Sequence, residues 1–395
     1  MLAFAMTLML ITGSDDPAVT GSRMEELQRA REEKAESLQK PQRTFLEKAL
    51  HEFKERRVME RFENGVYGFH PLLGGMHTGS GFAAGTYVEK DGIRASAQGS
   101  LKGYQRYELR LSTPRLIHES FFGELSATHR NYPQETFFGS GKDSLEEDRT
   151  NYRLEDTNYF GRFGYRASKH VKAGFHGGWL ETNVARGASN RVQSIEQVFG
   201  NDQAPGIDNQ PNYVQTGAFL EIDYRDEPNN PRSGGRYTAL WTSFNDLKLG
   251  EYDFGQYDVE VNQYFPFLNE RRVFAIRGKT TLTRTAPGHK VPFFMQRTLG
   301  GADDLRGFRE YRFRDNNIVV LNAEYRWEAF SGLDLALFVD AGQVAAKPTD
   351  IDFADLQKSY GFGFRFNTAK NVFVRMDVGL SKEGRQVFLK FSHVF

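Results

Sequence analysis

Cysteine is missing from all 395 residues of the sequence. Structural disulfides, thiolate zinc sites and cysteine nucleophiles are therefore excluded, while the redox compartment stays undecided. Basic and acidic residues balance at 51 each, so no nucleic acid or other polyanionic partner is indicated. P-loop, His-Glu-x-x-His and Gly-x-Ser-x-Gly motifs are also missing, and the nine histidines are scattered. We therefore predict a protein that is not an enzyme and needs no cofactor or metal.

Long apolar runs are missing too. After residue 13, no segment supplies the roughly 18 consecutive apolar residues that a spanning helix needs, and the mean hydropathy is −0.58. A helical membrane protein is therefore excluded. A membrane β-barrel is still allowed, because only every second residue of its strands faces lipid.

The N-terminal part differs in pattern from the rest of the chain. Its first thirteen residues, MLAFAMTLMLITG, have the length of a signal-peptide core but no basic residues before them. Residues 1–21 are therefore read as an export signal and linker, with a buried N-terminal helix as the alternative. Residues 22–64 are charged and helical in pattern, and they carry one apolar stripe, formed by Phe45, Leu46, Ala49, Leu50 and Phe53. This stripe predicts a helix packed in the periplasm or the lumen on its own protein, or a helix that binds a partner.

From residue 65 to 395 the apolar period changes from 3.6 to 2. In LDLALFVDAG, Leu333, Leu337 and Val339 lie on one face and Asp334 and Asp340 on the other. A soluble sandwich alternates in the same way, but it must bury its apolar faces in a common core. Most of the alternating segments are ten to fifteen residues long, and many carry aromatic residues near their ends. Both features favour strands that cross a membrane, which need roughly 9 to 11 residues.

The loop lengths support this interpretation. We place sixteen strands, at 66–75, 79–89, 92–101, 104–114, 120–132, 151–167, 170–184, 213–226, 235–247, 253–265, 271–285, 316–330, 333–344, 359–367, 371–381 and 386–395. The long connections all follow odd-numbered strands, at 133–150, 185–212, 286–315 and 345–358. Long loops on one rim and short turns on the other are typical of outer-membrane barrels. The predicted fold is an all-β, transmembrane, antiparallel β-barrel of about 16 strands.

The chain ends in GRQVFLKFSHVF, an alternating strand with Phe391 and a terminal Phe395. This end resembles the C-terminal recognition signal of outer-membrane barrel proteins. The resemblance implies insertion by the barrel-assembly machinery.

The loop 286–315 contains GGADDLRGF, in which Leu305, Arg306, Gly307 and Phe308 are consecutive. This stretch resembles the sixth-loop motif of the BamA/TamA superfamily, or bacterial surface antigen family, with Leu305 replacing the valine of Val-Arg-Gly-Phe. The stretches DYRDEPNNPRSGG, LNAEYRW and FVDAG resemble three further motifs of that family, in the same order. The resemblance covers about residues 65–395. The preceding helical segment resembles that of members without periplasmic POTRA domains.

The resemblance implies that the long loop folds back into the lumen, where Arg306 reaches the inner wall. Alternation independently places Glu324 and Asp340 on inward faces, and a guanidinium can bind either carboxylate with two hydrogen bonds. We expect a wet lumen to screen this pair to about 1 kcal/mol or less. Gly307 would allow a close approach to the wall or a positive φ. Three further arginines of the loop are expected to be solvated: Arg309, Arg312 and Arg314.

A second motif predicts a turn at the periplasmic rim. Prolines end strand pairing there and glycine suits the turn, so we interpret the charged residues as architecture rather than as a binding site. The turn comprises Asp223, Arg225, Asp226, Pro228, Pro231 and Gly234.

The family implies insertion or transport of protein or lipid at the bacterial outer membrane. Such a barrel would open a weak seam between its first and last strands, and the glycine-rich first strands suit this role. A passive diffusion pore and a membrane module for a separately encoded partner are the alternatives. About forty residues of charged helix cannot replace the periplasmic domains that collect clients by strand addition, which argues against a full assembly factor. The expected partners are the lipid bilayer and a protein or lipid client.

Overall fold

The computed structural model describes residue 29 and residues 68–74, 76–77, 79–113, 120–268, 271–330, 332–367 and 372–391. The predicted export signal in 1–21 and Phe395 lie outside the described residues. So do residues 22–64, except for Arg29, which is helical. Within the described ranges, no helix has the length and apolar character needed to cross a membrane.

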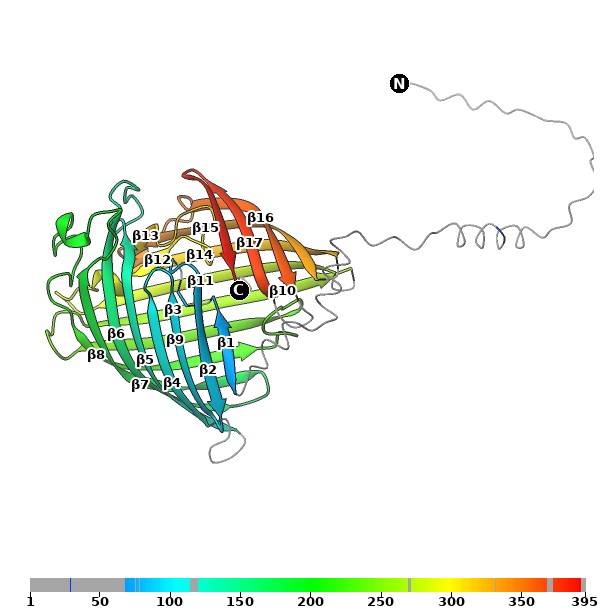
Figure 1. Cartoon of the computed structure of the whole chain (residues 1–395), viewed down its shortest axis with the longest axis horizontal. Helices are drawn as coiled ribbons and strands as arrows, with labels where there is room; N and C mark the ends of the chain where they lie inside the picture. The colour runs from blue at the N-terminus through cyan, green and yellow to red at the C-terminus, as the bar shows by residue number, and fades with distance from the viewer. Residues whose placement is uncertain are drawn as a thin grey trace, which may run out of the picture. The chain divides into compact units, whose positions relative to one another are not determined.

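Sixteen antiparallel strands form one curved sheet, in which each strand pairs with its neighbours along the chain (Figure 1). They are β1 (Phe69–Leu73), β2 (Ala83–Lys90), β3 (Ile93–Ser100), β4 (Gln105–Thr113), β5 (Phe121–Phe137), β6 (Thr150–Arg166), β7 (Val171–Arg186), β8 (Asn212–Asp223), β9 (Gly234–Asp246), β10 (Phe254–Phe267), β11 (Arg272–Thr285), β14 (Asn317–Phe330), β15 (Leu333–Ala345), β16 (Gln357–Asn367), β17 (Val372–Ser381) and β18 (Gly384–Lys390). The predicted barrel class and strand count are confirmed.

The connections contain the remaining elements. A short hairpin of β12 (Arg297–Leu299) and β13 (Phe313–Asp315) lies between β11 and β14. Three short 3-10 helices are η1 (Ile195–Gln197), η2 (Phe293–Met295) and η3 (Pro348–Asp350).

β5 continues to Phe137, past its predicted end at Tyr132. The register with β6 shifts between Tyr132 and Glu135, which marks a bulge around Pro133. Proline has no N–H for the ladder, so the sequence suggested a strand end, whereas the bulge lets pairing resume beyond it.

The strands turn their apolar side chains outward and their charges inward. On β15, Leu337 and Val339 are more than half exposed, whereas Asp334 and Asp340 are buried. The same holds on β5, where Leu125 is exposed. This polarity is opposite to that of a soluble protein and matches a barrel whose outer face contacts hydrocarbon.

The long connections leave one rim of the barrel, as predicted. They are residues 138–149, 187–211, 286–316 and 346–356. Exposed aromatic residues at the ends of strands lie at the opposite rim, where an interfacial girdle is expected: Tyr165, Tyr224, Phe267 and Phe330.

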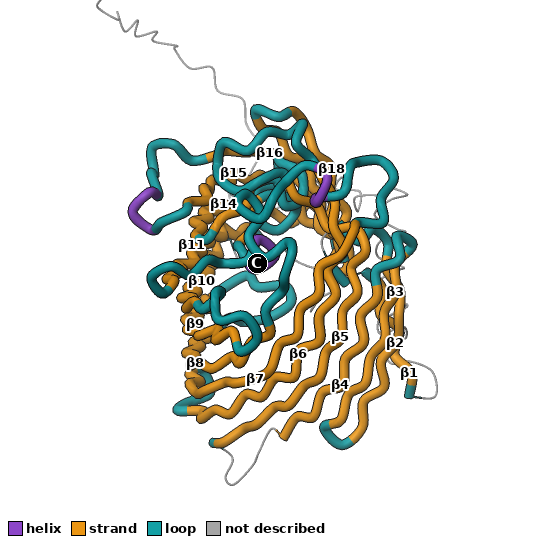
Figure 2. The backbone as a smooth tube through the Cα atoms, turned by 90° about the vertical axis from the view of Figure 1, so that its left-hand side faces the viewer, coloured by secondary structure: helices purple, strands orange, loops and turns teal. Residues whose placement is uncertain are grey.

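The connection 286–316, called here the lumen loop, packs against the inner wall. Its residues Leu299, Leu305, Phe308 and Phe313 form a buried cluster with Ile318 and Val320 of β14 and Val344 of β15. Figure 2 shows loop segments in teal within the curve of the orange sheet. The lumen loop therefore has an apolar core of its own.

Candidate functional site: the lumen loop and the strand seam

Arg306 occupies the centre of the contact between the lumen loop and the wall. Its Nε and Nη2 donate to the two carboxylate oxygens of Asp340, at 3.0 and 2.7 Å, and its Nη1 donates to Glu324 at 2.5 Å. The backbone N–H of Arg306 also donates to Asp340, at 3.1 Å. The guanidinium carbon of Arg306 lies 3.5 Å from the centroid of the Phe338 ring. The structure thus brings together the three charged residues that the sequence pairs.

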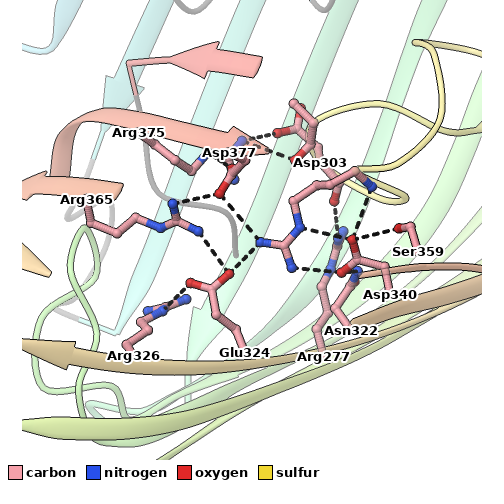
Figure 3. A network of polar contacts seen from close by, with 12 residues as sticks. Arg277, Asp303, Asn322, Glu324, Arg326, Asp340, Ser359, Arg365, Arg375 and Asp377 are labelled. Atoms are coloured by element: carbon pink, nitrogen blue, oxygen red, sulfur yellow. Dashed lines mark hydrogen bonds and ion pairs between the residues drawn. The ribbon is translucent and has the colours of Figure 1, made fainter. Parts of the chain in front are cut away.

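The carboxylate of Glu324 serves two further arginines. Arg326 donates to one of its oxygens at 2.8 Å, and Arg365 donates to the other at 3.0 Å. Arg365 also forms an ion pair with Asp377 at 2.7 Å, and Asp377 lies 3.3 Å from Nε of Arg375 (Figure 3). These partners were not predicted, and the signal that could have found them is alternation, since Arg365, Arg375 and Asp377 each stand between apolar residues in the sequence of β16 and β17.

The expectation of a wet, screened ion pair is wrong. The side chains of Arg306, Glu324, Asp340 and Asp377 all have no exposed surface. The apolar cluster of the lumen loop excludes solvent from them. Burial by itself lowers the pKa of Arg306, but Asp340 and then Glu324 outweigh this effect and raise it above its usual value. Removing Arg306 costs roughly 3 to 5 kcal/mol, because Asp340 then stays buried without an arginine partner.

Gly307 lies where the loop backbone touches the wall. A Cβ at this position would be 2.6 Å from the carbonyl oxygen of Leu380 and 2.6 Å from Cβ of Ser359. Gly307 is not among the glycines with positive φ. Of the two roles considered for this glycine, the structure therefore supports the close approach. Leu305 and Phe308, on either side of the Arg-Gly pair, are fully buried in the apolar cluster.

The other loop arginines differ from the expectation of a solvated surface. Arg309 agrees with it, because its side chain is about half exposed beside Glu146. Arg312 and Arg314 do not, since each is only 4% exposed. Arg312 donates to Glu383, and Arg314 donates to the carbonyl oxygen of Phe293. The expectation was wrong for both, because Arg312 reaches a turn of the distant β17–β18 hairpin and Arg314 reaches the other end of the lumen loop, and these contacts form only when the loop is folded.

The turn between β8 and β9 is held by its own charges. Arg225 binds Asp223 through two hydrogen bonds of 2.9 and 2.8 Å and donates to the carbonyl oxygen of Pro228. Asp226 accepts the backbone N–H groups of Arg232 and Ser233. These contacts stay within the turn, in keeping with an architectural role.

The turn between β8 and β9 also contacts the barrel wall, and it ends at a glycine with a positive φ. The carbonyl oxygen of Pro231 accepts a long bond of 3.5 Å from Arg326. Gly234 has φ +84, which other residues rarely adopt.

The sheet order begins with β1 and ends with β18. The seam between these two ends is defined here by residues 74, 76–77 and 79–82, which follow β1, and by residues 387–391 at the end of β18. Phe391 packs against Gly74, and its ring lies 6.4 Å from that of Phe82. A cavity of about 830 Å³ lies between these segments. It is lined by outward-facing apolar residues such as Val387 and Leu389 and also by polar residues of the lumen side. Residues from both faces of β18 therefore line the cavity.

Glu310 is a buried carboxyl of the lumen loop that lines this cavity. Burial is the main cause that raises its pKa to about 7, against the opposing attraction of Lys390. Because the folded state holds this proton more tightly than the usual carboxyl does, the contribution of Glu310 to the stability of the loop is fully present below about pH 4.5. This contribution is lost as the pH rises between the ordinary value of 4.5 and about 7.

We predict that Glu310→Gln removes this pH dependence. Protease cleavage within residues 286–316 should increase from pH 5 to pH 8 in the parent protein and stay flat in the variant, in an assay corrected for the protease's own pH profile. The stability involved is at most about 3 kcal/mol. An equal rise in both proteins would assign the pH dependence to another group.

Comparisons with known proteins agree with this geometry. Residues 89–386 match the model of the Omp85 superfamily domain. Among solved structures, BamA from Haemophilus ducreyi lacking POTRA domains 1–3 is similar at 12% identity and a TM-score of 0.59, over 87% of this chain and 77% of that one. CdiB from Escherichia coli is similar at 13% identity and a TM-score of 0.51, over 82% and 62%. No curated protein sequence matches.

The family model covers most of the chain, and the strand order, the outward apolar faces and the inward loop are those of an outer-membrane barrel. The likeness to BamA and CdiB, at such low identity, concerns the fold. The chain belongs to the Omp85 superfamily and is a BamA/TamA-type β-barrel of the bacterial outer membrane.

Proposed function

We propose that this barrel inserts or transports protein or lipid substrates through its seam. Its family and fold support a general role in insertion or transport at the outer membrane. The observation that carries the specific proposal is the seam cavity, whose lining joins apolar side chains to charged ones. A substrate with both apolar and polar parts would contact matching surfaces there. No enzymatic step belongs to this proposal.

The course of the lumen loop argues against the passive pore. Arg306 holds one part of the loop on β14 and β15. Phe293, in another part, packs against Phe137 of β5 and Tyr152 of β6, with ring centroids 5.2 and 4.8 Å apart. The loop thus contacts two separate stretches of the wall and obstructs the space between them. An obstructed lumen disfavours steady diffusion of solutes.

The proposal predicts that locking the seam stops activity. The cysteine-free chain allows a disulfide between Gly74→Cys and Phe391→Cys, because a Cβ on Gly74 would lie 3.1 Å from Cβ of Phe391 and a disulfide needs about 3.5 to 4.5 Å. The protein, reconstituted in phosphatidylethanolamine and phosphatidylglycerol vesicles, should accelerate folding of a client barrel or transfer of a labelled lipid. Oxidation of the double variant should abolish that acceleration, and reductant should restore it.

The two single-cysteine variants serve as controls, because oxidation cannot lock them. A large steady single-channel conductance without either activity would instead support the diffusion pore. Full activity of the oxidised double variant would exclude the seam as the route.

A further inference from the structure

Tyr311 has an unusual backbone conformation in the lumen loop. Its φ is +59, a left-handed value that a bulky residue adopts only when surrounding contacts hold it there. The side chain is directed to the N-terminal side of the seam, where its hydroxyl lies 2.8 Å from Nε2 of His77. Tyr311 therefore combines a strained backbone conformation with a hydrogen bond to His77.

His77 contacts two tyrosine rings and a buried carboxylate. Its ring stacks on Tyr132, with centroids 4.4 Å apart, and on Tyr311, with centroids 5.6 Å apart. Its Nε2 also lies 2.9 Å from Oε2 of Glu135, whose side chain is 5% exposed. A hydrogen bond to an ionised carboxylate is stronger than one between neutral groups. Because an ionised carboxylate only accepts, Nε2 carries the proton and shares it between Glu135 and the Tyr311 hydroxyl, so His77 joins the loop to the wall at β5.

The same stretch of loop also holds the C-terminal side of the seam. The carbonyl oxygen of Gly307 accepts a hydrogen bond from Ser381 at 2.7 Å, at the end of β17. Arg312 pairs with Glu383, in the turn between β17 and β18, at 2.9 Å. Residues 307–312 therefore contact both sides of the junction between the first and last strands.

We propose that Tyr311 and His77 form a latch that ties the lumen loop to the first hairpin and keeps the seam closed until the contact is released. This inference rests on the proposed function, in which the seam is the route of the substrate. The latch joins a tyrosine hydroxyl to an imidazole, whereas Arg306 forms charge-assisted hydrogen bonds with fully buried carboxylates, so the latch is the weaker of the two attachments. Release of the latch would free the N-terminal side of the seam and leave the loop attached to β14 and β15.

Thiol labelling in the full chain tests the latch. Ala83 is 1% exposed and packs with Met76, Tyr104 and Tyr132, so Ala83→Cys introduces one small buried thiol into the cluster that contains Tyr132, on which His77 stacks. A water-soluble maleimide can reach this thiol only when the first hairpin moves away. In vesicles of phosphatidylethanolamine and phosphatidylglycerol, Tyr311→Phe should increase the labelling rate by about tenfold, as expected for loss of one hydrogen bond.

Matched variants separate the latch from general loosening. Tyr257→Phe changes an exposed tyrosine on β10 and should leave labelling of Ala83→Cys unchanged. Ala275→Cys, fully buried on β11, should stay unlabelled in the Tyr311→Phe background. If that thiol reacts faster too, the variant has loosened throughout, and His77→Gln then decides. Selective labelling at residue 83 in His77→Gln supports the latch, and its absence overturns it.

The labelling test can reject the latch without rejecting the proposed function, and the reverse also holds. An unchanged labelling rate in Tyr311→Phe, with normal client folding, would overturn the latch and leave the function standing. Faster labelling without any insertion or transport activity would retain the latch and reject the proposed function.

Discussion

Arg306→Ala should release the lumen loop from the wall while the barrel itself stays folded. The change leaves Asp340 buried without its arginine partner, removes one of the three arginines that contact Glu324, and takes a nearby positive charge from the fully buried Asp377. We expect a loss of roughly 3 to 5 kcal/mol in the attachment of the loop. Protease added to intact cells should then cleave within residues 286–316, and the barrel should keep its heat-modifiable mobility on gels.

Arg309→Ala is the matched control, because Arg309 lies three positions along the same loop. Its side chain is about half exposed and its pair with Glu146 faces solvent, so the cost should be about 1 kcal/mol or less. Cleavage should therefore stay at the level of the parent protein. If both variants are cleaved equally, charge does not hold the loop, and its apolar cluster must.

Gly379→Ala should displace the same part of the lumen loop through a change in the wall. A Cβ on this residue of β17 would lie 2.0 Å from the carbonyl oxygen of Arg306 and 2.8 Å from the backbone nitrogen of Gly307. These neighbours are backbone atoms, so no side-chain rotation can relieve the overlap. The loop must move away, and the contacts of Arg306 must break or stretch. We expect a loss of about 3 kcal/mol or more in loop attachment, again measured by cleavage within 286–316.

Gly278→Ala on β11 is the control for this substitution. Its added Cβ would meet only Cδ2 of Leu321, at an ordinary 3.9 Å. The change in stability should stay within about 0.5 kcal/mol. Combining Arg306→Ala with Gly379→Ala should add little to the larger single effect, because both release one contact. Fully additive losses would show that the two residues act on different attachments.

The sequence located the strands because side chains alternate between lipid and lumen with a period of two. Sixteen segments could be placed in this way, and each overlaps an observed strand. The partners of Arg306 could be proposed for the same reason. Alternation assigns Glu324 and Asp340 to inward faces, and the loop motif supplies the cation.

Alternation could not predict that the ion pairs around Arg306 are shielded from solvent. Alternation says which face a charge occupies, but not whether water reaches it. That depends on Leu305, Phe308 and the rest of the loop cluster, which cover the ion pairs only after the loop folds back.

The alternation of apolar and polar residues was sufficient to predict the number of strands and a wall with apolar side chains outside and charges inside. These features depend on neighbours within a few residues of the chain. Tertiary structure alone decided that Arg314 reaches Thr136, 178 residues away, and that Tyr311 meets His77, 234 residues away. Such contacts arise because the curled sheet brings its first strands near its last ones and the loop crosses between them. Their geometry is set by the closure of the wall, and no periodicity in the sequence encodes it.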